Sequence, residues 1–133
     1  MLNYPYYLNA CLRSYWSEQS SNKGEIMRLP QPVQTFFDAD QDEGGRAPVD
    51  AFAPDAVVKD EGQVHQGHDA ISSWWSAAKA EYQHTAKPLK SAQENGVTTV
   101  RAKVTGNFPG SPAVLNFAFT LTGDRIAVLE IGS

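Results

Sequence analysis

Tight turns between β-forming segments constrain the fold of this chain more than any other feature. Asn95-Gly96 and Gly123-Asp124 are dipeptides typical of hairpin turns. Residues 108–112 contain two prolines and form a connection that no strand could include. These features separate four β-rich segments, at residues 84–92, 97–105, 113–122 and 126–131. Consecutive strands joined in this way predict an antiparallel meander.

A helix is predicted ahead of the meander. Pro30 and Pro32 suit a first helical turn, where a missing N–H costs nothing. Val33, Phe36 and Phe37 then follow at helical spacing. They form an apolar stripe that must be buried against the rest of the domain.

The chain between this helix and the meander predicts short elements and one long helix. We expect a second short helix at residues 47–52, a corner at 54–55, and two short strands at 56–60 and 63–66 that turn at Gly62. The long helix opens near residue 67. Its buried face is marked by apolar residues three and four apart: Ile71, Trp74, Trp75, Ala78 and Tyr82.

This order of elements predicts an α+β fold, with a bent antiparallel sheet wrapped around the N-terminal helices. The domain is expected to span residues 29–133. Residues 1–28 are aromatic at first and then polar, as in an N-terminal extension, and Met27 is an alternative start. Cys11 is the single cysteine, so no intramolecular disulfide can form.

Size and composition exclude several classes of function. A chain of 133 residues has room for one domain. Its net charge of -4 argues against nucleic acid as a partner, because a phosphate backbone requires a basic surface. The longest apolar runs are far shorter than a membrane span, and the first residues do not form a secretory signal. We therefore expect a soluble cytoplasmic protein that does not act at a membrane.

The residues that carry a family resemblance lie between residues 52 and 75. The run Phe-Ala-Pro-Asp-Ala-Val-Val-Lys-Asp at 52–60, followed by Gly67, Ala70-Ile71 and Trp74-Trp75, resembles the signature of SnoaL-like proteins. These belong to the nuclear-transport-factor-two-like superfamily, which includes ketosteroid isomerases, polyketide cyclases and dehydratases as well as non-catalytic modules. The resemblance covers about residues 29–133. It implies a cone-shaped fold around an apolar pocket.

The resemblance also assigns positions to a catalytic site. Asp60 falls on the general base of the isomerase branch. The tyrosine that donates to the oxyanion in that branch is replaced by Phe36, which cannot donate a hydrogen bond. The third isomerase residue, a protonated aspartate, falls on Asn116 or Phe117, depending on one gap near Gly123.

Asp60 and His84 are the two candidate catalytic residues. In an apolar pocket Asp60 could accept a proton; otherwise it is a solvated turn residue beside Glu61. His84 could act as acid, base or anchor for a substrate oxygen, or it could simply bond to backbone at a strand edge. His65 and His68 are expected to be exposed. The three histidines lack metal-ligand spacing, so no metal is expected.

The other candidate ligand-binding residues are apolar walls or core: Phe36, Trp74, Trp75 and Phe117, with Asn116 as the polar alternative. No nucleotide loop or Gly-x-Ser-x-Gly elbow is present, so no cofactor is expected.

Two functions remain open. One is an isomerase, cyclase or dehydratase that acts on a small apolar ring-containing carbonyl compound, with Asp60 as the base. The other is a non-catalytic module of the same fold that binds a small apolar ligand or another protein. The open sheet also predicts a homodimer in which both subunits use the same sheet face.

Overall fold

The computed structural model describes residues 28–42 and 45–133. Residues 1–27 of the predicted N-terminal extension, with Cys11 and Met27, lie outside the described residues. The elements are α2 (Gln31–Asp40), η1 (Val49–Ala51), β1 (Phe52–Asp60), β2 (Gln63–Gln66), α3 (His68–Tyr82), β3 (Thr85–Glu94), β4 (Val97–Thr105), β5 (Ala113–Thr122) and β6 (Arg125–Gly132). None of the helices in this part of the chain is long and apolar enough to cross a membrane.

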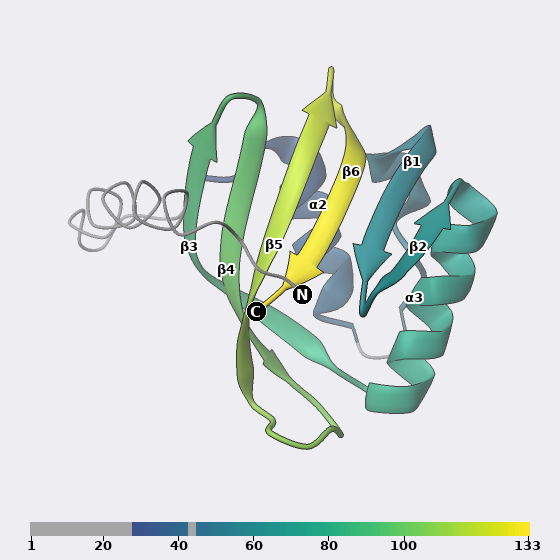
Figure 1. Ribbon diagram of the computed structural model, residues 1–133, viewed down its shortest axis with the longest axis vertical. Coiled ribbons are helices and arrows are strands. Elements are labelled where there is room, and N and C mark those ends of the chain that lie inside the picture. Colours follow the sequence, from purple (N-terminus) through teal and green to yellow (C-terminus); the bar gives the residue numbers. More distant parts are fainter. Residues whose placement is uncertain (1–27, 43–44) are drawn as a thin grey trace.

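The strands form one six-stranded sheet in the order β2-β1-β6-β5-β4-β3 (Figure 1). Strands β3 to β6 pair antiparallel in sequence order, which confirms the predicted meander. Strand β1 joins the sheet by parallel pairing with β6. The N-terminal hairpin therefore extends the same sheet instead of forming a separate layer.

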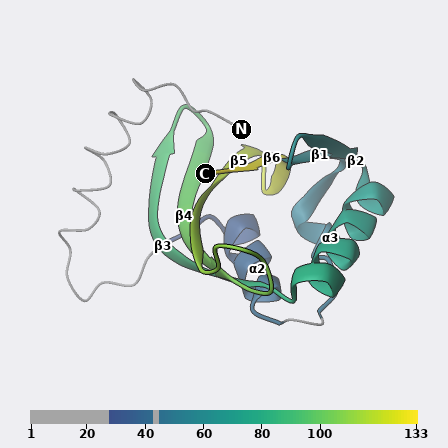
Figure 2. The same ribbon diagram turned by 60° about the horizontal axis from the view of Figure 1, so that its bottom comes forward.

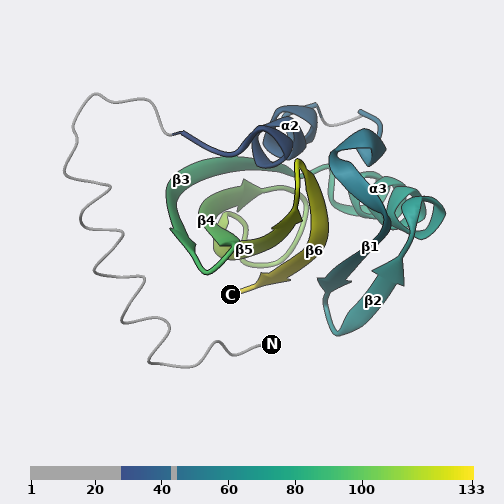
Figure 3. The same cartoon turned by 90° about the horizontal axis from the view of Figure 1, so that it is seen from above.

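The sheet is strongly curved, and both α-helices lie on its concave side (Figure 2). Helix α2 lies within the curve of the meander in that view, whereas α3 runs along the β1–β2 hairpin (Figures 2 and 3). This α+β arrangement is the predicted bent sheet wrapped around helices.

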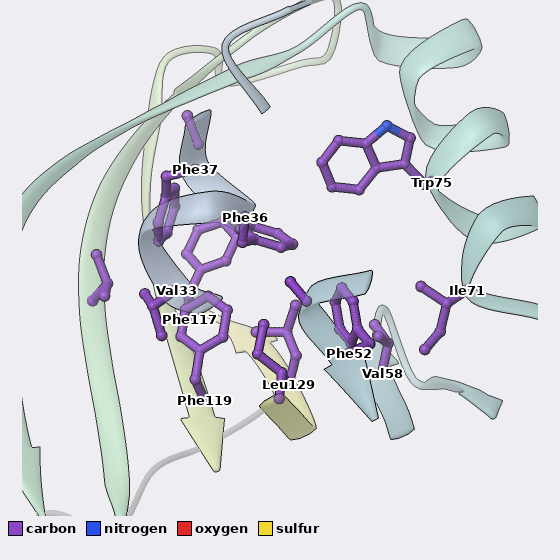
Figure 4. Packing of buried hydrophobic residues seen from close by; sticks show 14 of the residues in the cluster. Val33, Phe36, Phe37, Phe52, Val58, Ile71, Trp75, Phe117, Phe119 and Leu129 are labelled. Carbon is purple, nitrogen blue, oxygen red and sulfur yellow. The ribbon is translucent and has the colours of Figure 1, made fainter. Parts of the chain in front are cut away.

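Helix α2 is held in the curve by aromatic packing. Val33, Phe36 and Phe37 are each at most 2% exposed, as the helical spacing of the sequence indicated. Phe36 and Phe37 make edge-to-face contacts with Phe119 of β5, at centroid distances of 5.3 and 5.7 Å. From α3, Trp75 reaches toward this cluster (Figure 4). The core thus joins α2, α3 and the centre of the sheet.

The alternation in β4 matches its predicted orientation. Val100, Ala102 and Val104 are buried against the core, whereas Arg101 and Lys103 are exposed on the other face. The basic pair therefore lies on the convex surface of the sheet.

The short helix predicted at residues 47–52 is present in reduced form, as the three-residue 3₁₀ helix η1. The corner expected at 54–55 was wrong, because these residues lie inside β1. The pairing of β1 with β6 shifts register between Phe52 and Val57. Pro54 lies in that irregular stretch, where its missing N–H breaks no regular ladder bond.

Phe37 is a direct test of the aromatic core, because it is 1% exposed and does not line the cavity described below. Phe37→Ala should lower the free energy of unfolding by about 3–5 kcal/mol in urea titrations. Val64→Ala is the control, since Val64 is 64% exposed and its truncation should change stability by less than about 0.5 kcal/mol. A loss below about 1 kcal/mol for Phe37→Ala would contradict this account of the core.

The homodimer predicted from the open sheet stays a prediction, because the structure describes one chain. Sedimentation at micromolar concentration should give about twice the 14.5 kDa of the chain. A species of 14.5 kDa under those conditions would rule the prediction out.

Candidate active site

A cavity of about 710 Å³ lies between the two helices and the concave face of the sheet. Six aromatic side chains contribute to its walls: Phe36, Trp74, Trp75, Tyr82, Phe108 and Phe117. Its polar lining includes the carboxyl groups of Asp40, Asp60, Glu61 and Glu81, and the imidazoles of His65 and His84. The cavity is therefore mostly apolar with a few converging polar groups, as is typical of a small-molecule site.

Asp60 lines this cavity because of the turn that follows it. Asp60 pairs with Gln63, so Glu61 and Gly62 form a two-residue loop. Both loop residues have positive φ, 54° and 76°, as a type I′ hairpin requires. Asp60 therefore remains the last residue of β1, half-buried at the wall of the cavity.

The Asp60 carboxylate is held by one hydrogen bond. The indole Nε1–H of Trp74 donates to Asp60 Oδ2 at 3.0 Å. Among the described residues, Asp60 accepts no other side-chain hydrogen bond. One carboxylate oxygen is thus oriented by α3, and the other is left for a ligand.

The two alternatives at the isomerase's third position lie on opposite faces of β5. Phe117 is 5% exposed and lines the cavity. Asn116 pairs with Arg101 and Gly132, and it does not line the cavity. Successive side chains of a strand point to opposite faces, so Asn116 lies on the convex side of the sheet.

Phe36 and Trp75 also line the cavity but offer no hydrogen bond to a ligand. Phe36 is 2% exposed and packs edge-to-face on Trp75 at 5.4 Å. The Trp75 Nε1–H donates to the carbonyl of Gly45 at 3.1 Å. Both therefore form apolar wall.

A buried ion pair borders the cavity through Asp40, which lines it. Lys79 of α3 is 5% exposed, and its Nζ lies 2.8 Å from Oδ1 of Asp40, which is 2% exposed. The ammonium also donates to the backbone carbonyls of Asp40 and His84, at 2.9 and 2.7 Å. Its three donors are therefore fully used, and its charge is neutralised by Asp40.

His84 lies beside this pair. Its Nε2 is 3.5 Å from Asp40 Oδ1, and its side chain is 21% exposed. Gly106 allows this close packing, because a Cβ there would lie 2.9 Å from the Cβ of His84. His84 Nδ1 and Asp40 Oδ2 are both buried without a hydrogen-bond partner in the described part of the chain. This end of the cavity thus keeps unused polar atoms.

Tyr82 lies near Asp60 and Glu61. The negative charge of Glu61, followed by that of Glu81, raises the pKa of the Tyr82 phenol above its ordinary value of 10.0. The ring of Tyr82 packs edge-to-face on that of Phe108, at a centroid distance of 6.0 Å. The loop at 108–112 therefore contributes to the cavity wall.

The other two histidines are both partly buried, although the sequence predicted them to be exposed. His65 lines the cavity, and its ring centroid is 6.1 Å from that of Trp74. His68 Nε2 lies 3.0 Å from the carbonyl oxygen of Phe52. Across residues 28–42 and 45–133, no group of three His, Cys, Asp or Glu side chains could hold a metal ion.

Sequence reasoning missed Asp40, Lys79 and Tyr82 as polar residues of the site. A signal was present for two of them: Asp40 and Lys79 interrupt apolar helical stripes, at three and four residues from Phe37 and Trp75. Opposite charges on two buried stripes indicate a buried pair.

Comparison with solved structures identifies the family. A proposed polyketide cyclase from Sinorhizobium meliloti is 50% identical to this chain, with a TM-score of 0.74; the match covers 77% of this chain and 94% of that one. This chain belongs to the SnoaL/NTF2-like superfamily. No family model matches it, and neither does any curated protein.

More distant structures share the fold of this SnoaL/NTF2-like chain. A ketosteroid isomerase-like fold from Catenulispora acidiphila, solved with trimethylamine, is 19% identical over 80% of this chain and 87% of its own, with a TM-score of 0.67. An NTF2-like protein from Cytophaga hutchinsonii is 13% identical over 81% and 91%, with a TM-score of 0.61. At these identities only the fold is shared.

Breaking the buried pair should destabilise the fold strongly. Lys79→Met leaves the Asp40 carboxylate buried without its cation, so unfolding free energy should fall by about 3–5 kcal/mol. The double variant with Asp40→Asn removes both charges and should be more stable than Lys79→Met alone. Urea titrations measure both. A double variant as unstable as the sum of the two single changes would contradict the pairing.

The pKa of Tyr82 reports the negative charge at the cavity. Glu61→Gln removes the largest cause of the shift, so the Tyr82 pKa should fall toward 10.0. The ultraviolet absorbance of tyrosinate is followed against pH, and the curve of the same protein carrying Tyr82→Phe is subtracted. The difference is the titration of the Tyr82 phenol alone. An unchanged pKa in Glu61→Gln would show that Glu61 does not act on Tyr82.

Proposed function

We propose that this protein catalyses proton transfer next to a carbonyl group of a small ring-containing compound, as an isomerase, cyclase or dehydratase does. The observation that carries the proposal is the Asp60 carboxylate, half-buried at the wall of a cavity of about 710 Å³ and oriented by the Trp74 N–H. A base must be positioned within reach of the proton that it removes. The cavity supplies room for a substrate at that carboxylate.

Asp60 is the proposed general base. Trp74 holds Oδ2, which leaves Oδ1 as the atom that takes the proton. A fixed carboxylate loses less orientational freedom when the substrate binds. Trp74 is thus a positioning residue for Asp60.

His84 is the proposed group that stabilises negative charge on the substrate oxygen. The other candidates that the sequence offered are accounted for: Phe36 has no donor, the indole N–H groups of Trp74 and Trp75 bond to Asp60 and Gly45, and Asn116 lies outside the cavity. His84 lines the cavity beside the Asp40 carboxylate. An imidazole N–H there would donate to an enolate oxygen.

The similarity to a proposed polyketide cyclase supports this chemistry. Ring closure between a carbon next to one carbonyl and a second carbonyl begins with removal of the α-proton. An isomerisation through an enolate begins with the same step. We therefore propose only the α-proton abstraction, which cyclisation and isomerisation share.

Hydrogen–deuterium exchange tests the step without knowledge of the natural substrate. The protein should accelerate exchange of the α-protons of 2-tetralone in D₂O, followed by proton NMR. Asp60→Asn should reduce the acceleration by about a hundred- to ten-thousand-fold, because the amide cannot accept the proton. His84→Gln should reduce it as well, and Trp74→Phe should have a smaller effect than Asp60→Asn.

Asp55→Asn is the matched control, since Asp55 is an exposed aspartate of the same strand outside the cavity. Its exchange rate should equal that of the wild type. Equal rates for Asp60→Asn and wild type would exclude Asp60 as the base. Binding of 2-tetralone without any accelerated exchange would instead favour the non-catalytic ligand-binding module.

A further inference from the structure

The charged side chains that line the cavity are mostly acidic. Its lining holds four carboxyl groups and, among the described residues, no lysine or arginine. Asp40 is neutralised by the buried Lys79. Asp60, Glu61 and Glu81 form no ion pair with any described residue. The cavity therefore has a negative potential, and the raised pKa of Tyr82 has the same cause.

Aromatic faces lie next to these carboxylates. The Trp74 indole donates a hydrogen bond to Asp60, and Tyr82 lies close enough to Glu61 for that carboxylate to raise its pKa, so each ring is near one acid. Aromatic faces attract cations, and the attraction is largest for organic ammonium groups that lose little hydration. The same protein already contains such a contact: Lys79 Nζ lies 5.3 Å from the ring centroid of Trp75.

A second observation indicates that the cavity receives a polar ligand. Asp40 is 2% exposed and lines the cavity, yet its Oδ2 has no hydrogen-bond partner in the described part of the chain. His84 Nδ1, on the same wall, is also without a partner there. Buried polar atoms without partners are costly, so a bound molecule with donors would stabilise this end of the cavity.

We propose that the cavity selects an organic cation, an amine or quaternary ammonium compound with an apolar body, and rejects anions. The ammonium group lies against Trp74 and Tyr82 beside the carboxylates of Asp60 and Glu61. The apolar body extends toward Phe36 and Phe117, and a donor group carried on it reaches the unpartnered Asp40 Oδ2. Conversion of such a compound rests on the proposed function; its binding in the cavity does not.

The charge balance of the proposed reaction favours such a substrate. Removal of an α-proton by Asp60 creates an enolate inside a cavity that already carries uncompensated carboxylates. The Lys79 ammonium has all three donors engaged and cannot turn to the enolate. A positive charge on the substrate offsets the developing negative charge, in addition to the hydrogen bond from His84.

Three probes of similar shape and different charge test the selection by titration calorimetry on the full chain: phenyltrimethylammonium, tert-butylbenzene and benzenesulfonate. The cation should bind about tenfold more tightly than its neutral isostere. Benzenesulfonate should not bind. Affinity for the cation should weaken as the salt concentration is raised, because salt screens the exposed carboxylates of Glu61 and Glu81.

Variants locate the site. Trp74→Leu removes the ring face and should weaken cation binding about tenfold, whereas Trp74→Phe keeps a ring and should weaken it less. Glu61→Gln changes an exposed residue and should reduce affinity without affecting folding. Glu130→Gln is the matched control: Glu130 is exposed, lies next to the cavity residue Ile131, and does not line the cavity. Its affinity should equal that of the wild type.

Equal or tighter binding of tert-butylbenzene, binding of benzenesulfonate, or no binding of any probe would overturn the inference. Loss of affinity in Glu130→Gln equal to that in Glu61→Gln would also overturn it. The proposed function can fail independently of this inference. If Asp60→Asn leaves 2-tetralone exchange unchanged and the cation still binds, the cation site is supported and Asp60 is excluded as the base. If Asp60→Asn slows the exchange and the cation binds no better than tert-butylbenzene, Asp60 is the base of a site without cation selectivity.

Discussion

The ammonium group of Lys79 connects three parts of the fold that are far apart in sequence. It bonds to the side chain and the backbone of Asp40 at the end of α2, and to the backbone of His84 just before β3. These bonds fix the separation of α2 and α3 at one end of the sheet. The aromatic contacts of Phe36 with Trp75 and Phe119 fix it further along. The cavity exists because the helices are held apart in this way and do not close onto each other.

The polar groups around the cavity form two sets. In one, charge is neutralised, and Asp40 and His84 retain buried polar atoms without partners in the described part of the chain. In the other, Asp60, Glu61 and Glu81 remain uncompensated, and Trp74 and Tyr82 lie near them. A proton acceptor and a candidate proton donor thus line the same cavity, on walls built from different elements. A site that moves a proton from carbon to oxygen requires such a separation.

The meander could be predicted from the sequence because its signals are local. Asn95 and Gly96 have the positive φ values that their hairpin turn requires, and β4 and β5 have the expected bounds. The corner expected at 54–55 was wrong because the parallel pairing of β1 with β6, a long-range contact, extends the strand back to Phe52. Asp60 and His84 were predicted as candidates, but the bond from Trp74 to Asp60 was not. That bond depends on how α3 is rotated against the β1–β2 hairpin, which packing decides.

The proposed function depends on one arrangement: the Asp60 carboxyl group lines the cavity and accepts a hydrogen bond from the Trp74 indole. Nitrogen-15 NMR of the tryptophan indole groups tests it most directly. The Trp74 Nε1–H resonance should move with pH along the titration curve of one carboxyl group, and the movement should be absent in Asp60→Asn. A Trp74 indole resonance that is independent of pH, or that titrates unchanged in Asp60→Asn, would contradict the account.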